Sequence, residues 1–437
     1  MHLWALVWCS ASALIVPRVT RHRQRFGATA YSEEALAFIE EKAALDLARS
    51  LETVELASSS TVFVRTAVAP SRSPPLILVH GFDSSALEFR RLMPALEARG
   101  VEAYALDVLG WGLTVPKAGV TVAEKRAQLG EFMDAVIGKG RKVTLVGASL
   151  GGAICIDSFC DDSARVESIA LIDPQCLIDG TPPVPRPLAR WGVRVLASWP
   201  LRSAANRMAY ADKSLATDDA IRVGLLHTKR VGWEDDAIEW LLGGGYSVSS
   251  QVSKLRETPT LVLWGEDDGI LPPADNLPRL GELLPDALVQ IVADCGHVPH
   301  LEQPEQTADA LAAFVSTGRV EGVVAAASAW PPARAAAPAA ASLFVATASD
   351  DAPPRAYDWT ILSRGPPPRR SPPRPTADDD VVTVRWGSPL TIAGLLFFVP
   401  LFSSELFFAI SRQFICSSRQ LALADLCTPI ISPNASP

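Results

Sequence analysis

The sequence lacks any Cys-x-x-Cys pair and any cysteine–histidine spacing typical of metal ligands, although it holds seven cysteines in 437 residues. An odd number of cysteines at irregular spacing excludes a disulfide scaffold and a zinc cage. We therefore expect free thiols that pack as small apolar side chains in a reducing compartment. The four cysteines of the central region to which this applies are Cys155, Cys160, Cys176 and Cys295.

Positive charge is also scarce, because 40 Lys and Arg residues stand against 48 Asp and Glu residues. The formal net charge of −8 excludes nucleic acid as a partner. Only 20% of the residues are charged and 48% are hydrophobic, so the chain is too apolar for wholesale disorder and can bury a large core. The length predicts two or three domains, and changes in composition indicate where they begin and end.

The first thirty-two residues contain no Asp or Glu, and two glutamates then follow Ser32, a candidate helix N-cap. Before Ser32, an apolar stretch from Leu3 to Val16 contains small residues at positions 11–13, and four arginines follow between positions 18 and 25. We interpret residues 1–31 as a targeting presequence. The order of these features resembles a bipartite plastid-targeting presequence of an alga, which predicts a plastid location. A mitochondrial presequence, an endomembrane anchor and a wrong start codon are the alternatives.

The C-terminal quarter is rich in proline, since 16 of the 35 prolines lie in residues 320–437. We expect an Ala/Pro-rich disordered linker over residues 319–390, because such sequence cannot pack a core. Residues 391–437 form a hydrophobic tail, in which residues 391–410 have the length of a membrane span but contain a proline and a glutamate. A membrane anchor, a membrane-surface or disordered tail, and a wrongly assigned intron or frame remain the alternatives for this tail.

Between these ends, short β-branched runs alternate with helical patterns, which predicts an α/β fold with a mostly parallel sheet and helices on both faces. Residues 174–259 contain no clear strand and are rich in proline and then in apolar helical pattern. We expect a helical cap there, inserted between a first core part, 32–173, and a second core part, 260–318. The expected strands are Thr61–Val68, Leu76–Val79, Val101–Leu106, Lys142–Val146, Ser168–Ile172, Thr260–Leu263 and Leu288–Val292.

Ser149 is the strongest candidate for a catalytic residue. It is the centre of a Gly-x-Ser-x-Gly motif, from Gly147 to Gly151, that follows an apolar strand and precedes a helical pattern. A serine at such a sharp strand-to-helix turn has a strained backbone, and side chains two positions away would clash unless they are glycine. The motif in this context predicts a nucleophilic serine.

A serine hydroxyl is a weak nucleophile and needs a histidine base that a carboxylate holds in place. In folds that carry this turn, the acid and then the histidine follow the serine along the chain. An acidic loop follows the strand expected at residues 260–263, and it contains Asp267 and Asp268. His297 follows the strand expected at residues 288–292. The sequence therefore contains all three residue types in the required order.

Four motifs resemble those of the α/β-hydrolase superfamily, and the resemblance extends over about residues 76–315. They are His80 to Phe82, Gly147 to Gly152, Trp264 to Asp268 and Gly296 to Pro304. The resemblance implies an α/β-hydrolase fold, with Ser149 as nucleophile, Asp268 as acid and His297 as base. The residues of these motifs are similar to those of a plastid-type branch of the superfamily in plants and algae.

The same resemblance implies an oxyanion hole formed by the backbone N–H groups of Phe82 and Leu150. It implies neither a metal nor a cofactor. Asp267 stays open as an alternative acid because it is the neighbour of the favoured residue. Asp173 stays open because some relatives place the acid after the preceding strand. We expect His300 to be a buried structural histidine or part of the pocket rim.

These residues predict a serine hydrolase that cleaves a carboxylic ester. The cap stretch 188–210 combines tryptophan, leucine and valine with basic charges only, which favours an apolar or lipid-like substrate. A membrane surface is a second candidate partner. An acyltransferase that uses the same acyl-enzyme, a hydrolase of carbon–carbon bonds and a ligand receptor with a hydrolase fold are the alternatives.

Overall fold

The computed structural model describes residues 31–71, 73–180, 184–320 and 323–325. The predicted presequence, linker and hydrophobic tail lie outside the described residues, apart from a few residues at their boundaries. Among the described helices, none is both long enough and apolar enough to cross a bilayer.

One twisted sheet organises the described chain, with the strand order β1-β2-β4-β3-β6-β7-β8-β9-β10 and β5 paired to β2. The strands from β4 to β9 in this order are parallel, and β1, β2, β5 and β10 pair antiparallel at the edges. The predicted mostly parallel sheet is confirmed. The strands are β1 (Glu52–Glu55), β2 (Ser59–Arg65), β3 (Leu76–Val79), β4 (Ala103–Leu106), β5 (Val115–Pro116), β6 (Val143–Ala148), β7 (Val166–Ile172), β8 (Thr260–Gly265), β9 (Leu288–Val292) and β10 (Val324–Ala325).

Sequence patterns missed the short edge strands β1, β5 and β10 and extended two other strands by two or three residues. The missed strands are two to four residues long, and β1 is half-buried or exposed throughout. Such strands carry no apolar run and no clear alternation, because their neighbours rather than their side chains stabilise them. The strands β3, β4, β6 and β8 were found because they are buried throughout and consist mostly of apolar residues.

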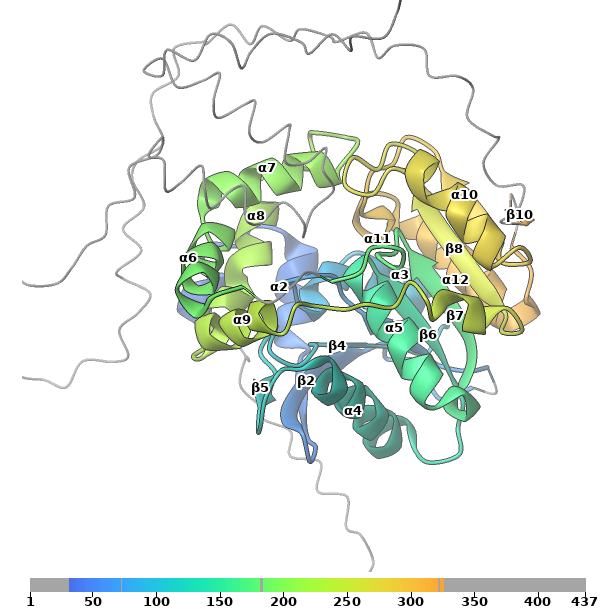
Figure 1. Cartoon of the computed structure of the whole chain (residues 1–437), viewed down its shortest axis with the longest axis horizontal. Coiled ribbons are helices and arrows are strands. Elements are labelled where there is room, and N and C mark those ends of the chain that lie inside the picture. The colour runs from blue at the N-terminus through green and yellow to red at the C-terminus, as the bar shows by residue number, and fades with distance from the viewer. Residues whose placement is uncertain (1–30, 72, 181–183, 321–322, 326–437) are drawn as a thin grey trace, which may run out of the picture.

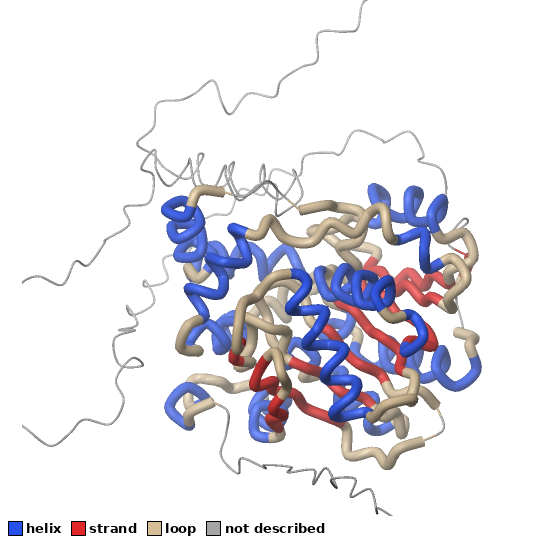
Figure 2. The backbone as a smooth tube through the Cα atoms, turned by 60° about the horizontal axis from the view of Figure 1, so that its bottom comes forward, coloured by secondary structure: helices blue, strands red, loops and turns tan. Residues whose placement is uncertain are grey.

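Helices cover both faces of the sheet, and alternate residues of one strand show which helices lie on which face. In β3, Ile77 and Val79 pack into the cluster that contains α4, α5 and α10, whereas Leu76 and Leu78 pack with α2, α3 and α12. Figure 2 shows the strands with helices around them. These helices are α2 (Lys42–Arg49), α3 (Leu92–Ala98), α4 (Val122–Phe132), α5 (Leu150–Asp161), α10 (Pro273–Leu283) and α12 (Pro304–Thr317).

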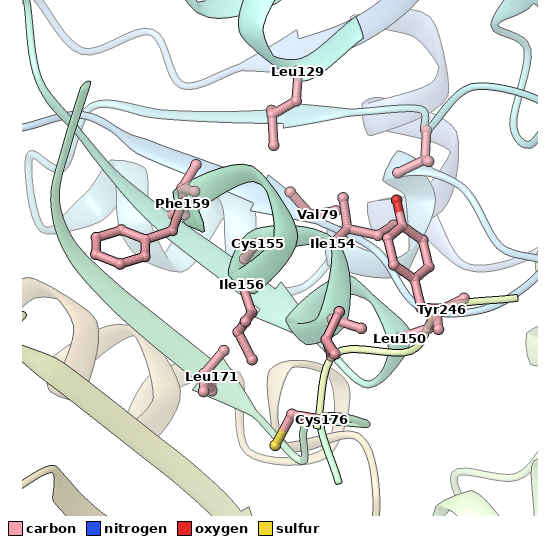
Figure 3. Packing of buried hydrophobic residues seen from close by; sticks show 14 of the residues in the cluster. Val79, Leu129, Leu150, Ile154, Cys155, Ile156, Phe159, Leu171, Cys176 and Tyr246 are labelled. Atoms are coloured by element: carbon pink, nitrogen blue, oxygen red, sulfur yellow. The ribbon is translucent and has the colours of Figure 1, made fainter. Parts of the chain in front are cut away.

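The helix α5 shows how the first of these two cores is packed (Figure 3). Ile154, Cys155 and Ile156 are at most 1% exposed and belong to the same cluster as Leu171 and Val79 of the sheet. Free thiols are confirmed at the four central cysteines, three of them buried and Cys160 half-buried. The short helix α1 (Glu33–Leu36) begins at the predicted cap, where the Ser32 hydroxyl accepts the backbone N–H of Ala35 at 3.2 Å.

The described part of residues 174–259 contains helices and no strand. These helices lie together on one side of the sheet in Figure 1. Only Leu201 is buried among the residues of α7, so the cap is packed more loosely than the core. The cap helices are α6 (Arg186–Leu196), α7 (Trp199–Ala209), α8 (Asp218–Leu225), η4 (Leu226–Lys229) and α9 (Trp233–Leu242).

Candidate active site

Ser149 lies at the turn between β6 and α5, with a backbone φ of 50° and ψ of −119°. This left-handed conformation is strained for a residue with a side chain. The chain passes so closely here that a Cβ atom on Gly147 would lie 2.4 Å from the Gly151 carbonyl oxygen, and one on Gly151 would lie 2.0 Å from that of Val79. The two glycines are therefore required by the turn, and Ser149 lines a cavity at the carboxyl edge of the sheet.

His297 follows β9 and lines the same cavity as Ser149. Its Nδ1 lies 2.7 Å from Oδ2 of Asp268, in a buried contact. The other carboxylate oxygen of Asp268 accepts the backbone N–H groups of Ile270 at 2.8 Å and Leu271 at 2.9 Å. Burial opposes ionisation of Asp268, but the neighbouring His297 and these hydrogen bonds lower its pKa below the usual value. The ionised carboxylate therefore accepts a hydrogen bond from Nδ1–H of His297, and in the neutral ring the lone pair then lies on Nε2.

Asp267 and Asp173, the two alternative acids, lie in different surroundings. Asp267 is exposed, whereas Asp173 is fully buried after β7, and one of its oxygens accepts the Gly265 N–H at 2.9 Å. Burial and the charge of Asp268 raise the pKa of Asp173 well above its usual value. Of the two neighbouring carboxyl groups, Asp173 therefore carries a proton and Asp268 carries the negative charge. The structure places Asp268 rather than either alternative in hydrogen-bond contact with the histidine.

Asp173, Asp268 and His297 also form a group, among the described residues, whose ligand atoms lie within 4.8 Å of one another. Such a group has the composition of a metal site. However, Nδ1 of His297 and Oδ2 of Asp268 are bonded to each other. We interpret the group as two carboxyl groups that share one proton on the Nδ1 side of His297.

Phe82 follows β3, and Leu150 is the first residue of α5. Neither of their backbone N–H groups has an acceptor in the part of the chain that the structure describes. Leu150 directly follows Ser149, and Phe82 lines the cavity. Both N–H groups are free to bind an oxygen that gains negative charge near Ser149.

The loop that carries Phe82 is held rigidly from the core side. Nδ1 of His80 lies 2.8 Å from the Gly81 carbonyl oxygen, and Nε2 accepts the Val108 N–H at 3.0 Å. Burial lowers the pKa of His80 to about 4, so the ring is neutral and donates from Nδ1. The Gly81 N–H donates to the buried carboxylate of Glu88 at 3.2 Å, and Glu88 also lies 3.3 Å from Nε2 of His300. His300 is 1% exposed and therefore belongs to this supporting network.

Asp83, the residue after Phe82, attaches this loop to the cap. Oδ1 of Asp83 accepts Nε1–H of Trp233 at 2.9 Å and is bonded to Nε2 of His227 at 3.0 Å. Oδ2 accepts the guanidinium of Arg202. Burial opposes the charge of Asp83, but Arg202 and His227 hold its pKa well below the usual range. Sequence patterns did not identify Asp83, because its three partners lie 119 to 150 positions further along the chain.

The cavity that contains Ser149 and His297 has a volume of about 260 Å³ and lies between the core loops and the cap. Most of its wall is apolar. Of the cap residues that favoured an apolar substrate, Leu196 and Leu201 line it, whereas Trp191 and Trp199 do not. Its apolar side chains are Phe82, Leu87, Ile178, Leu196, Leu201, Ala205, Ala209, Ala220, Ile221, Val223, Ile270, Leu271, Val298 and Leu301.

Comparison with known proteins identifies the family of the chain. The chain is 35% identical over 250 residues to the alpha/beta hydrolase domain-containing protein VTE7 of Arabidopsis thaliana, covering 55% of this chain and 74% of that protein. It is 27% identical over 255 residues to lipase 1 of Psychrobacter immobilis, covering 55% and 77%. The solved structure of a meta-cleavage product hydrolase from Pseudomonas fluorescens shares the fold, with a TM-score of 0.50, 21% identity, and coverage of 61% and 98%. Residues 76–310 match the alpha/beta hydrolase family model, and the chain therefore belongs to the α/β hydrolase family.

Proposed function

We propose that the protein is a serine hydrolase that cleaves a carboxylic ester with Ser149, His297 and Asp268. The observation that carries this proposal is the buried 2.7 Å contact between His297 and an ionised Asp268, in a cavity that Ser149 also lines. This contact directs the free Nε2 of the histidine away from Asp268, where it can act as a base.

In the proposed reaction, Nε2 of His297 takes the hydroxyl proton of Ser149 while Oγ attacks the ester carbonyl carbon. The carbonyl oxygen becomes negatively charged and is bound by the N–H groups of Phe82 and Leu150. The tetrahedral intermediate collapses, and the alcohol leaves with the proton from His297. Water then attacks the acyl-enzyme with the same histidine as base, which releases the carboxylic acid and restores Ser149. These steps require neither a metal nor a cofactor.

We infer an apolar substrate from the cavity wall, because burial of an apolar acyl or alcohol group there removes apolar surface from water. The likeness to a bacterial lipase supports the same substrate class. A membrane surface is the proposed source of such a substrate. We further propose a plastid location, which the composition of residues 1–31 and the likeness to a plant relative support. Imaging of the full chain with a C-terminal fluorescent tag tests the location, and a cytosolic or mitochondrial signal would contradict it.

The proposed nucleophile is tested with a fluorophosphonate probe, which reacts with an activated serine. We expect the probe to label the wild-type protein and not Ser149→Ala, and we expect ester hydrolysis to fall by a factor of about 10⁴ to 10⁶. Ser84→Ala is the matched control, because Ser84 lines the same cavity. Equal labelling of Ser149→Ala and the wild type would refute the assignment.

A further inference from the structure

The cavity has two walls of different character. Towards the cap, Leu196 and Leu201 pack with Phe82 in a small cluster. The second wall contains Leu87 of the core and Val223 of the cap helix α8, which belong to the cluster that also contains Phe89. The polar side chains that α7 adds to the first wall are Arg202, whose guanidinium is bonded to Asp83, and Asn206, whose amide donates to the Thr217 carbonyl oxygen at 3.4 Å. The second wall contains two polar side chains, Arg90 and Tyr210, that the proposed reaction does not use.

Arg90 is only 4% exposed although it is charged. Its Nε donates to Oε2 of Glu41 at 2.7 Å, and Nη1 donates to the carbonyl oxygen of Leu87 at 3.3 Å. Its third nitrogen, Nη2, is buried and has no hydrogen-bond partner among the described residues. A buried N–H group without an acceptor is costly and rare in folded proteins. The free donor of Arg90 therefore indicates a ligand atom at this wall.

Tyr210 follows α7 and is 2% exposed. Burial raises its pKa, whereas the charges of the Arg90 and Arg91 guanidinium groups and a side-chain contact with Arg90 act in the opposite direction. Tyr210 therefore keeps its proton and can donate it. Glu41 is the carboxylate bonded to both arginines, so one positive charge of the pair is not balanced by it. Glu88 lines the same wall as a second carboxylate with a lowered pKa, so the wall offers hydrogen-bond donors without excess positive charge.

Glu88, a further polar side chain at this side of the cavity, already has partners. Glu88 accepts the Gly81 N–H and contacts His300. We propose that Arg90 and Tyr210 form a subsite for an acceptor oxygen of the substrate, a carbonyl or carboxylate remote from the scissile ester. The substrate class is then an ester with one apolar arm and one arm that ends in this oxygen. This inference rests on the proposed ester hydrolysis.

The test uses three esters of equal chain length whose acyl arm ends in a methyl group, a methyl ketone or a carboxylate. We expect the wild type to prefer at least one oxygen-bearing ester to the methyl ester by about tenfold or more in kcat/KM. Arg90→Met and Tyr210→Phe should each reduce this ratio several-fold. Because the ratio compares substrates on one preparation, a partly misfolded variant does not change it. The ketone and carboxylate arms distinguish a neutral from an anionic acceptor.

Arg207→Met is the matched control, because Arg207 is an exposed arginine of α7, the helix that ends just before Tyr210, and does not line the cavity. It should leave the ratio unchanged. A wild-type ratio near one for both oxygen-bearing esters, or a ratio that both subsite variants retain, would overturn the subsite. Calorimetric binding of the same esters to Ser149→Ala separates the two proposals. If no ester is hydrolysed but binding prefers the oxygen-bearing arm, the reaction is wrong and the subsite stands.

Discussion

The loops at the strand ends and the cap are built in different ways. Ser149, Asp268 and His297 follow β6, β8 and β9, which belong to one parallel run of the sheet. Their positions are set by strand pairing and by buried apolar runs. The cap has no strand pairing with this sheet among the described residues, and its helix α7 buries only Leu201. The proposed reacting groups thus rest on paired strands, whereas part of the proposed substrate-binding wall rests on the more loosely packed cap helix α7.

Several buried polar contacts join the described part of the cap to the core, and two of them depend on single charged side chains. One is Asp83 with its three cap donors. The other is Lys125 of α4, whose Nζ donates to the Leu109 carbonyl oxygen and lies 3.8 Å from the Trp111 ring centre and 4.8 Å from that of Trp240 in α9. A lysine ammonium over two indole rings is stabilised by cation–π attraction. Single substitutions at the strand-end loops and at these two junctions can therefore test the different roles of core and cap.

The largest effect is expected at the strand-end loops. Asp268→Asn should lower kcat/KM by a factor of about 10⁴, because an amide at this position does not stabilise the charged His297 and can impose the wrong tautomer. Asp267→Asn should have little effect, since Asp267 is exposed. Steady-state kinetics on a soluble ester measures both. A larger loss in Asp267→Asn than in Asp268→Asn would exchange their roles.

A smaller effect is expected at the first junction between cap and core. Asp83→Asn removes the charge that pairs with Arg202, and we expect it to lower the free energy of unfolding by about 2 to 3 kcal/mol. The value lies below that of a fully buried pair because the Arg202 side chain is 16% exposed. We also expect kcat to fall, since Asp83 follows Phe82. Urea denaturation is the measurement, and the exposed Asp235→Asn is the matched control. Equal stability of the two variants would show that the cap does not depend on this junction.

The smallest effect is expected at the second junction and depends on pH. Burial lowers the pKa of Lys125 to about 7 in the folded protein, whereas the unfolded chain keeps a value near 10.5. Between these values the unfolded state binds more protons, so the contribution of Lys125 to stability rises with pH. The wild type should gain about 2 kcal/mol relative to Lys125→Met between pH 7 and pH 9. Denaturation at several pH values measures this difference, and a difference independent of pH would mean that Lys125 titrates normally.

Features with local causes could be predicted from the sequence. The turn at Ser149 requires glycine on both sides because the backbone itself leaves no space for a Cβ atom. The central strands were found because they are buried on both faces and read as apolar runs. The edge strand β1 was missed because its stability comes from pairing with β2, which no pattern within four residues can show.

The polar contacts of the site could be predicted only in part. The motif resemblance implied Asp268 as the acid and left Asp267 and Asp173 as alternatives. Only the folded chain brings Asp268 to 2.7 Å from His297 and gives Asp173 the role of a neutral neighbour. Burial and the distances between charges decide which carboxyl is ionised, and neither quantity exists before the strands have paired.

By itself, the sequence determined the sheet, the strained serine turn and the residue types of the proposed reaction, because glycine sterics and apolar periodicity act over a few residues. Tertiary structure decided which side chains line the cavity. It placed Arg90 and Tyr210, which are far apart in the chain, on one wall, and it attached the cap to the loop of Phe82 through Asp83. Long-range polar pairing has no sequence period, so it becomes visible only when the backbone has folded.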